Sequence, residues 1–172
     1  ITNFLEKVIH DKTQDPQEIF PAPLTENAYE HCVRLQYFNS TPEKSGFEED
    51  MTPQRDITDI FRNGWSAGEK GAYLEFTFRG TGAAVQYRRV KDGPAPIATA
   101  VVDEYPETAC VLDGTFDETW GDKMKLTTVA EHLPYGEHRV HVEITETHAE
   151  DKAEFYLVSV IVSGVREEGN TK

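Results

Sequence analysis

The residues Gly64-Trp65-Ser66-Ala67-Gly68 fit the pattern Gly-x-Ser-x-Gly, which presents a nucleophilic serine in many hydrolases. That chemistry requires the serine to lie on a sharp turn between a strand and a helix, beside an oxyanion hole. Here the motif leads into residues 72–78, whose alternating apolar and polar pattern predicts a strand. We therefore interpret the motif as a Gly-rich hairpin turn and expect no catalytic role for Ser66.

The histidines could bind a metal ion only if several of them converged. His138 and His141 are three residues apart in a segment of strand-like pattern, so they should lie on opposite faces of a sheet. No His-Glu-x-x-His motif and no Cys-His cluster occurs in the sequence. We predict that His138 is buried and hydrogen-bonded, and we predict no zinc site.

Asp113, Asp117 and Asp122 surround a predicted turn and could offer oxygen ligands to calcium. The segment lacks the EF-hand pattern, because Thr115 stands where another oxygen-rich ligand is usual. We expect a solvated acidic loop, with a structural calcium as the alternative, and we predict no other cofactor.

The same loop carries Trp120 next to acidic residues, a combination that suits carbohydrate. A sugar ring stacks on an aromatic side chain, and its hydroxyls pair with planar polar groups. The alternative is that Trp120 packs over the edge of the fold. The residues predicted to bind carbohydrate are Trp120, Tyr87, Arg88, Tyr105 and Asp103.

The N-terminal third predicts helices. Residues 1–9 place their apolar side chains on one helical stripe, and residues 11–23 read as a proline-containing linker. Thr25 is a plausible N-cap for a second helix, whose apolar side includes Cys32 and Leu35. A loop then extends to residue 55.

From residue 56 the period changes to alternation, with turn signals at short intervals. This pattern predicts an all-β protein, an antiparallel two-sheet β-sandwich of the jelly-roll, galactose-binding-like class, with about eight strands between residues 56 and 164. The segment 155–162 is apolar at nearly every position, which indicates a strand buried on both faces. The predicted core comprises Phe76, Phe78, Val85, Val102, Val142, Ile144, Leu157, Val160 and Ile161.

The chain of 172 residues has a formal net charge of −14, which disfavours nucleic acid and anionic membrane surfaces as partners but allows a neutral sugar. No apolar run approaches the length of a membrane span, and no leader pattern is present. Cys32 and Cys110 cannot form a disulfide framework, and we interpret both as buried thiols. These features favour the cytoplasm over secretion.

Three segments resemble a known family. The stretch from Phe20 to His31 resembles the segment that joins the catalytic domain to a C-terminal domain in some bacterial SGNH (GDSL-type) hydrolases. The stretches from Phe78 to Arg88 and from Leu133 to Val140 are similar to the jelly-roll accessory domains of such enzymes. The shared features are the turn Gly80–Gly82, Asp103 at the end of the following strand, and the strand start Gly136–His138.

The resemblance implies that residues 1–23 are the end of a catalytic domain and a linker, and that residues 56–165 are the accessory domain. Residues 24–55 would then pack on the sandwich, and 166–172 would form a disordered tail. The catalytic Gly-Asp-Ser block and Asp-x-x-His pair of the family are missing here, so we expect no enzyme activity from this chain. The expected function is carbohydrate binding; the alternative is docking on the catalytic domain or homo-oligomerisation.

Overall fold

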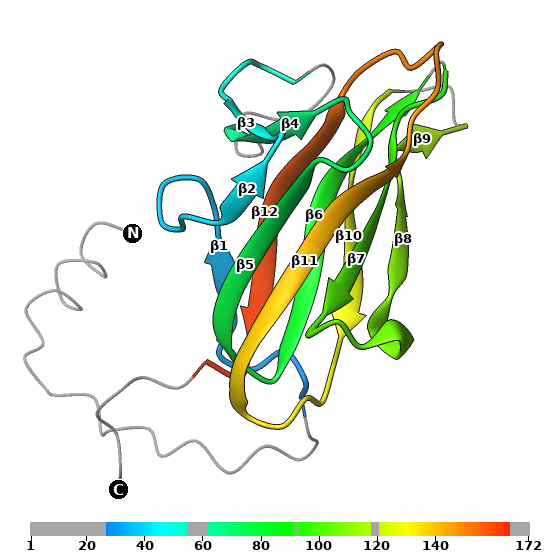
Figure 1. Cartoon of the computed structure of the whole chain (residues 1–172). Helices are drawn as coiled ribbons and strands as arrows, with labels where there is room; N and C mark the ends of the chain where they lie inside the picture. The colour runs from blue at the N-terminus through cyan, green and yellow to red at the C-terminus, as the bar shows by residue number, and fades with distance from the viewer. Residues whose placement is uncertain (1–26, 55–61, 92, 118–120, 166–172) are drawn as a thin grey trace, which may run out of the picture.

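The computed structural model describes residues 27–54, 62–91, 93–117 and 121–165, and nearly all of their regular structure is β-strand (Figure 1). In chain order the elements are β1 (Val33–Leu35), β2 (Glu43–Ser45), β3 (Glu48–Asp50), β4 (Gly64–Ala67), β5 (Tyr73–Gly80), β6 (Gly82–Lys91), β7 (Ile97–Val102), the 3-10 helix η2 (Pro106–Thr108), β8 (Cys110–Asp113), β9 (Thr115–Phe116), β10 (Lys123–Ala130), β11 (Gly136–Glu146) and β12 (Phe155–Ser163).

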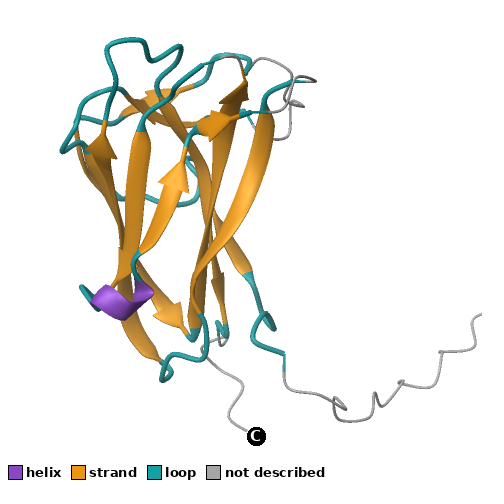
Figure 2. Ribbon diagram, turned by 90° about the vertical axis from the view of Figure 1, so that its right-hand side faces the viewer, coloured by secondary structure: helices purple, strands orange, loops and turns teal. Residues whose placement is uncertain are grey.

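These strands form two sheets that face each other in two layers (Figure 2). The seven-stranded sheet has the order β10-β6-β12-β4-β3, with β1 added to β12 and β9 added to β6. The five-stranded sheet has the order β2-β5-β11-β7-β8. All pairings are antiparallel except that of β6 with β9. The predicted all-β, two-sheet sandwich is confirmed.

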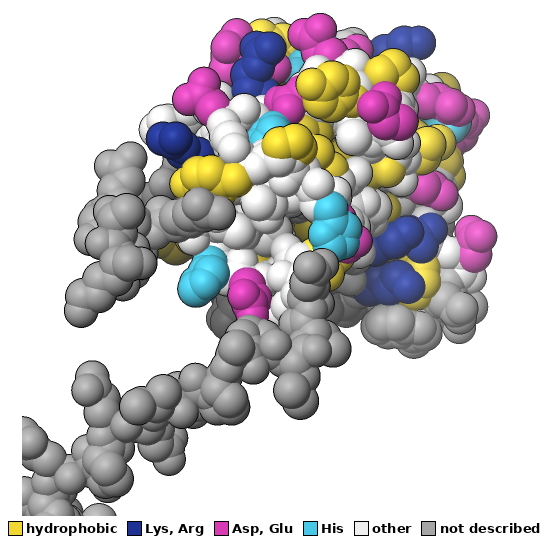
Figure 3. Space-filling view, turned by 90° about the horizontal axis from the view of Figure 1, so that it is seen from below, with side chains coloured by type: hydrophobic (Ala, Val, Ile, Leu, Met, Phe, Trp, Pro, Cys, Tyr) yellow, Lys and Arg dark blue, Asp and Glu magenta, His cyan; other side chains and the backbone are white. Residues whose placement is uncertain are grey.

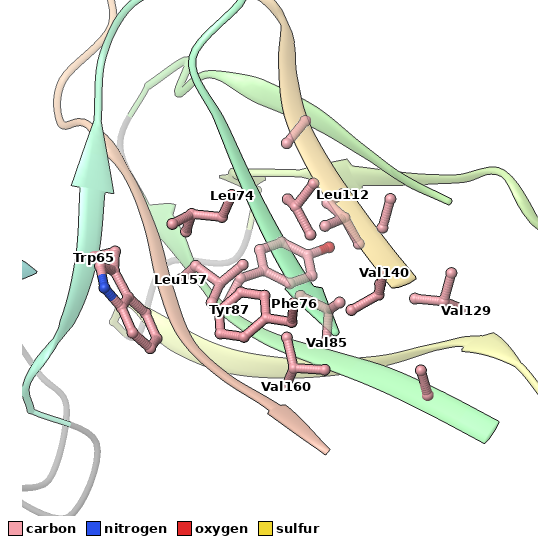
Figure 4. Packing of buried hydrophobic residues seen from close by; sticks show 14 of the residues in the cluster. Trp65, Leu74, Phe76, Val85, Tyr87, Leu112, Val129, Val140, Leu157 and Val160 are labelled. Atoms are coloured by element: carbon pink, nitrogen blue, oxygen red, sulfur yellow. The ribbon is translucent and has the colours of Figure 1, made fainter. Parts of the chain in front are cut away.

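Alternation along the strands builds the core between the sheets. In β5 every second side chain from Leu74 to Phe78 is buried, and in β6 Val85 and Tyr87 point the same way (Figure 4). Trp65 of β4 meets the ring of Phe76 edge to face, with centroids 5.3 Å apart. Of the predicted core residues, all but one are buried. Ile161 is only half-buried, because it points to the outer face of β12.

A β-bulge interrupts the alternation in β12. Leu157 pairs with Tyr87, whereas Ser159 pairs with Gln86, so β12 has one more residue than β6 over this stretch. As a result Leu157 and Val160 both join the core, although they are three residues apart. Ser159 is turned to the other face, where it contacts a side chain of β1.

The structure corrects the prediction for the N-terminal part. The predicted second helix is wrong, because residues 28–31 form turns and Val33–Leu35 is a strand that pairs with β12. The sandwich therefore includes β1, β2 and β3 and does not begin at residue 56. The predicted helix at 1–9, the linker at 11–23 and the tail at 166–172 lie outside the described residues.

Two further predictions are wrong. The Gly64–Ala67 segment is not a hairpin turn but strand β4, paired with β12 on one side and β3 on the other. Cys32 is exposed and Cys110 half-buried, so neither is a buried core thiol. Among the described residues, no helix has the length and apolar character needed to span a membrane.

Candidate functional site

Those predicted carbohydrate-binding residues that the structure describes do not come together. Arg88 lies near one end of β6, whereas Asp103 and Tyr105 follow β7 at the opposite end of the sandwich (Figure 1). Trp120 lies outside the described residues. The structure therefore offers several separate surfaces.

Tyr87 has to be removed from the predicted set. Its side chain is fully buried, and its ring stacks on Phe155 of β12 with centroids 5.5 Å apart. Burial also raises the pKa of its hydroxyl above the ordinary value. Because neighbouring residues of a strand point to opposite faces, Tyr87 and Arg88 cannot contribute to one surface. Tyr87 is a core residue.

Arg88 projects from the outer face of the seven-stranded sheet and is held by its neighbours. Its guanidinium donates hydrogen bonds to the Gln54 side-chain oxygen and, over 3.1 Å, to the backbone oxygen of Glu154. It also lies over the ring of Tyr156, 5.4 Å from the centroid. Burial raises the pKa of the Tyr156 hydroxyl to about 12, so this ring is neutral under Arg88.

A second arginine on the same outer face was not predicted. Arg34 of β1 donates to Ser159 Oγ over 3.0 Å and to Gln86 Oε1 over 2.6 Å. Ser159 Oγ lies 3.2 Å from the same Gln86 oxygen, which closes a three-membered network across β1, β12 and β6. The strand pattern of residues 83–90 could have placed Gln86 beside Arg88, but nothing local in the sequence brings Arg34 to them.

We call this surface the arginine face, defined by Arg34, Gln86 and Arg88 with Met124 and Leu126 of β10; Ser159, which Arg34 contacts, is fully buried beneath it. Met124 pairs with Arg88 and Leu126 with Gln86, and paired residues of antiparallel strands share a face. Leu126 is largely exposed. The surface thus places fixed planar polar groups beside the exposed side chain of Leu126 and the half-buried side chain of Met124, a combination of polar and apolar contacts that suits a sugar.

Asp103 has a structural role at the other end of the sandwich. Its carboxylate oxygens lie 2.5 Å from His138 Nδ1 and 2.8 Å from the backbone N of Arg139. His138 Nε2 lies 2.8 Å from the backbone oxygen of Pro134. The prediction that His138 is buried and hydrogen-bonded is confirmed. His141 points to the opposite face, where it stacks on Tyr73.

Burial of the His138 ring lowers its pKa, but the hydrogen bonds to Asp103 and Pro134 and the Asp103 charge raise it more, so the pKa ends above the ordinary value. A backbone oxygen and a carboxylate both accept hydrogen bonds, so both ring nitrogens must donate. Both ring nitrogens donate only in the protonated ring, so this arrangement favours an imidazolium between Asp103 and Pro134, and Asp103 is engaged in holding it.

Tyr105, two residues after Asp103, is half-exposed at this end of the molecule. Figure 3 views the same end, where hydrophobic, acidic, basic and histidine side chains are mixed across the part of the surface that is drawn in colour. Tyr105 is thus accessible to a ligand, but it follows β7 of the five-stranded sheet and is not part of the arginine face, which lies on the seven-stranded sheet.

Ser66 is not part of a nucleophile elbow. It lies within strand β4, and its hydroxyl donates a 2.6 Å hydrogen bond to Glu154 Oε2. In the described part of the chain, no three His, Cys, Asp or Glu side chains are grouped closely enough to hold a metal ion. Asp113 and Asp122 instead accept hydrogen bonds from backbone N–H groups of Thr115 and Lys91.

Solved structures provide the most informative comparison. The chain is 44% identical to part of a two-domain esterase (CEX) active on acetylated mannans, with a TM-score of 0.78. The match covers 96% of this chain and 45% of that chain. A structure of the same description, co-crystallised with mannopentaose, matches with 44% identity, a TM-score of 0.77, and coverage of 96% and 44%. The chain therefore spans less than half the length of the esterase that it resembles.

A more distant structure is that of a family two carbohydrate esterase from Cellvibrio japonicus, with 15% identity and a TM-score of 0.50 over 78% of this chain and 34% of that chain. At this identity the likeness concerns the fold alone. No protein-family model matches the chain, and no curated protein matches its sequence.

Proposed function

We propose that this chain is a carbohydrate-binding accessory domain that works beside an esterase catalytic domain on acetylated mannan. The observation that carries the proposal is the 44% identity, over nearly the whole chain, to less than half of a two-domain esterase active on that polysaccharide. We infer further that the catalytic domain is of the SGNH type, on the resemblance of residues 20–31 to the linker of such enzymes.

The arginine face is the surface that we propose for the sugar. Arg34 donates hydrogen bonds to side chains of β12 and β6, and Arg88 donates to Gln54 and to the backbone of Glu154, so little side-chain freedom is lost when a sugar hydroxyl binds. Leu126 offers apolar area beside them for the C–H groups of a sugar ring. Tyr105, which lies outside this face, stays a proposed stacking residue, and so does Trp120.

The decisive experiment is isothermal titration calorimetry with mannopentaose, with cellopentaose as a second probe. We expect saturable binding of mannopentaose and an affinity at least about tenfold lower in Arg88→Met, because a hydrogen bond from a charged group contributes about 1.5–3 kcal/mol. The matched control is Arg79→Met, since Arg79 is exposed on the five-stranded sheet. Absence of saturable binding in the unmodified chain would refute carbohydrate binding. An unchanged affinity in Arg88→Met would refute the location.

Exposed apolar residues favour docking as a second candidate function. Tyr29, Val33, Phe38 and Met51 are 39–66% exposed, and all come from the short N-terminal strands and their loops. Such residues mark protein contacts when they are gathered into a patch. If docking is the function, Phe38→Ser should weaken association with the separately expressed catalytic domain in analytical ultracentrifugation, while Val111→Ser on the far edge should not.

A further inference from the structure

A pocket of about 440 Å³ opens where the chain crosses from one sheet to the other between β1 and β2. We propose that this crossover pocket is a second sugar subsite, distinct from the arginine face; the proposal rests on the function proposed above. Its lining residues are Leu35, Asn39, Ser40, Thr41, Pro42, Glu43, Glu75, Phe76 and Thr77. Its volume falls within the range of about 300–1,000 Å³ that is usual for small-ligand sites.

The pocket follows from the topology. β1 pairs with β12 in the seven-stranded sheet, whereas β2 pairs with β5 in the five-stranded sheet, so residues 36–42 must bridge the two layers (Figure 1). β2 covers β5 only as far as Glu75. The stretch of β5 beyond Glu75 therefore has no partner strand on this side among the described residues, and the crossover forms a wall beside it.

The crossover is held in one conformation by its own side chains. The Asn39 side chain accepts a 2.7 Å hydrogen bond from the backbone N of Gln36 and donates a 3.0 Å bond to the backbone oxygen of Arg34. Ser40 Oγ donates a 2.6 Å bond to the Gln36 backbone oxygen. A wall fixed in this way is preformed for a ligand, which reduces the entropic cost of binding.

The chemistry of the lining selects a neutral ligand rich in hydroxyl groups. Leu35 and Pro42, both partly exposed, provide apolar contact area, as one face of a pyranose requires, while the Phe76 ring is buried in the core behind them. Around them, Glu43 and Glu75 contribute carboxylates and Thr77 an exposed hydroxyl. The carboxylates only accept hydrogen bonds, so the ligand has to donate several, and two negative charges disfavour an anionic ligand.

Both carboxylates already have counterparts that hold them in place. Tyr73 Oη donates to Glu43 Oε1 over 3.2 Å. Arg139 Nη1 and His141 Nδ1 lie 3.3 Å and 3.4 Å from the two Glu75 oxygens. With Glu75 paired to a guanidinium, the ligand does not have to be a cation to offset the charge, which again favours a neutral sugar.

The subsite is tested by filling it. Thr77 is exposed on β5, so Thr77→Trp should fold normally and occupy the pocket with its ring. Val111→Trp is the matched control, because Val111 is 63% exposed on β8 at the far edge of the same sheet. Equal melting temperatures of both variants and the unmodified chain establish that the fold is intact.

Titration of each protein with mannopentaose then separates the outcomes. We expect the affinity to fall at least about tenfold in Thr77→Trp, a change of about 1.4 kcal/mol, and to stay within twofold in Val111→Trp. Full binding by Thr77→Trp would overturn the subsite while leaving carbohydrate binding intact. No binding by the unmodified chain would overturn the proposed function, and the subsite with it.

Discussion

Replacement of Asp103 by Asn tests whether His138 is an imidazolium in the folded protein. The substitution keeps the shape of the side chain, and its oxygen can still accept from the backbone N of Arg139. Asp103 has a φ of 53°, a conformation that Asn adopts more readily than most residues, so the turn is preserved. What is lost is the negative charge 2.5 Å from His138 Nδ1.

The size of the effect follows from the geometry. A hydrogen bond with a charged partner contributes about 1.5–3 kcal/mol and a neutral one about 0.5–1.5 kcal/mol. In Asp103→Asn a neutral His138 can still accept from the new amide, so we expect a loss of about 1–2 kcal/mol. For a chain of this length that corresponds to a decrease in Tm of about 2–8 °C.

The loss should depend on pH, because the clamp raises the pKa of His138. A raised folded-state pKa contributes stability in full below the unfolded value of about 6.5 and loses it as the pH rises through the folded-state pKa. The difference in Tm between the unmodified chain and Asp103→Asn should therefore be largest near about pH 5.5 and shrink toward about pH 9.

Differential scanning calorimetry across this pH range measures that difference directly. The control is Glu104→Gln, which removes a charge from the adjacent exposed residue of the same turn. If the difference between the unmodified chain and Asp103→Asn stayed constant from acid to alkaline pH, His138 would be neutral in the fold and the argument from its two acceptors would be wrong.

Substitutions at three other positions have expected outcomes. Tyr87→Phe should leave mannopentaose affinity within twofold by calorimetry, because the side chain is fully buried; Tyr87→Ala should cost about 3–5 kcal/mol in urea unfolding by removing the contact with Phe155. Ser66→Ala should not change any turnover of p-nitrophenyl acetate. It should lower the free energy of unfolding by no more than about 1 kcal/mol, since the Ser66 hydroxyl makes one hydrogen bond, to Glu154. Gly64→Ala should destabilise by about 1–3 kcal/mol, because a Cβ there would meet the backbone oxygen of Leu157; an unchanged urea midpoint would contradict it.

The parts of the fold that were predicted correctly are those with a long local period. Eight or more residues in each of β5, β11 and β12 either alternate between apolar and polar or are nearly all apolar. A helix does not fit such a pattern over this length. β1 has only three residues, and the spacing of Tyr29, Cys32 and Val33 imitates a helical stripe. Residues 33–35 form a strand only because they pair with β12, and that pairing joins residues more than 120 positions apart in the sequence.

Dependence on pairing between distant strands also explains why the candidate site could not be predicted in full. Successive side chains of a strand point to opposite faces, so the positions of Tyr87 and Arg88 in the sequence already indicate that they cannot share one site. The pairing of Arg34 with Gln86 and Ser159, in contrast, depends on which strands become neighbours in the sheet. The glycines of the motif Gly64–Gly68 led to the wrong prediction of a turn. Gly64 instead permits a close approach of β4 to the backbone of β12.

The bulge in β12 links the core to the arginine face. Strict alternation would place Leu157 and Ser159 on one face, so a core leucine would bring a serine hydroxyl into the core with it. The extra residue lets Leu157 and Val160 both pack inward while Ser159 faces out to meet Arg34 and Gln86. One irregularity thus satisfies the packing between the sheets and completes the polar network outside them. Bulges recur where a strand has to re-aim a side chain, and here that side chain, itself fully buried, accepts a hydrogen bond from Arg34 of the surface proposed to bind sugar.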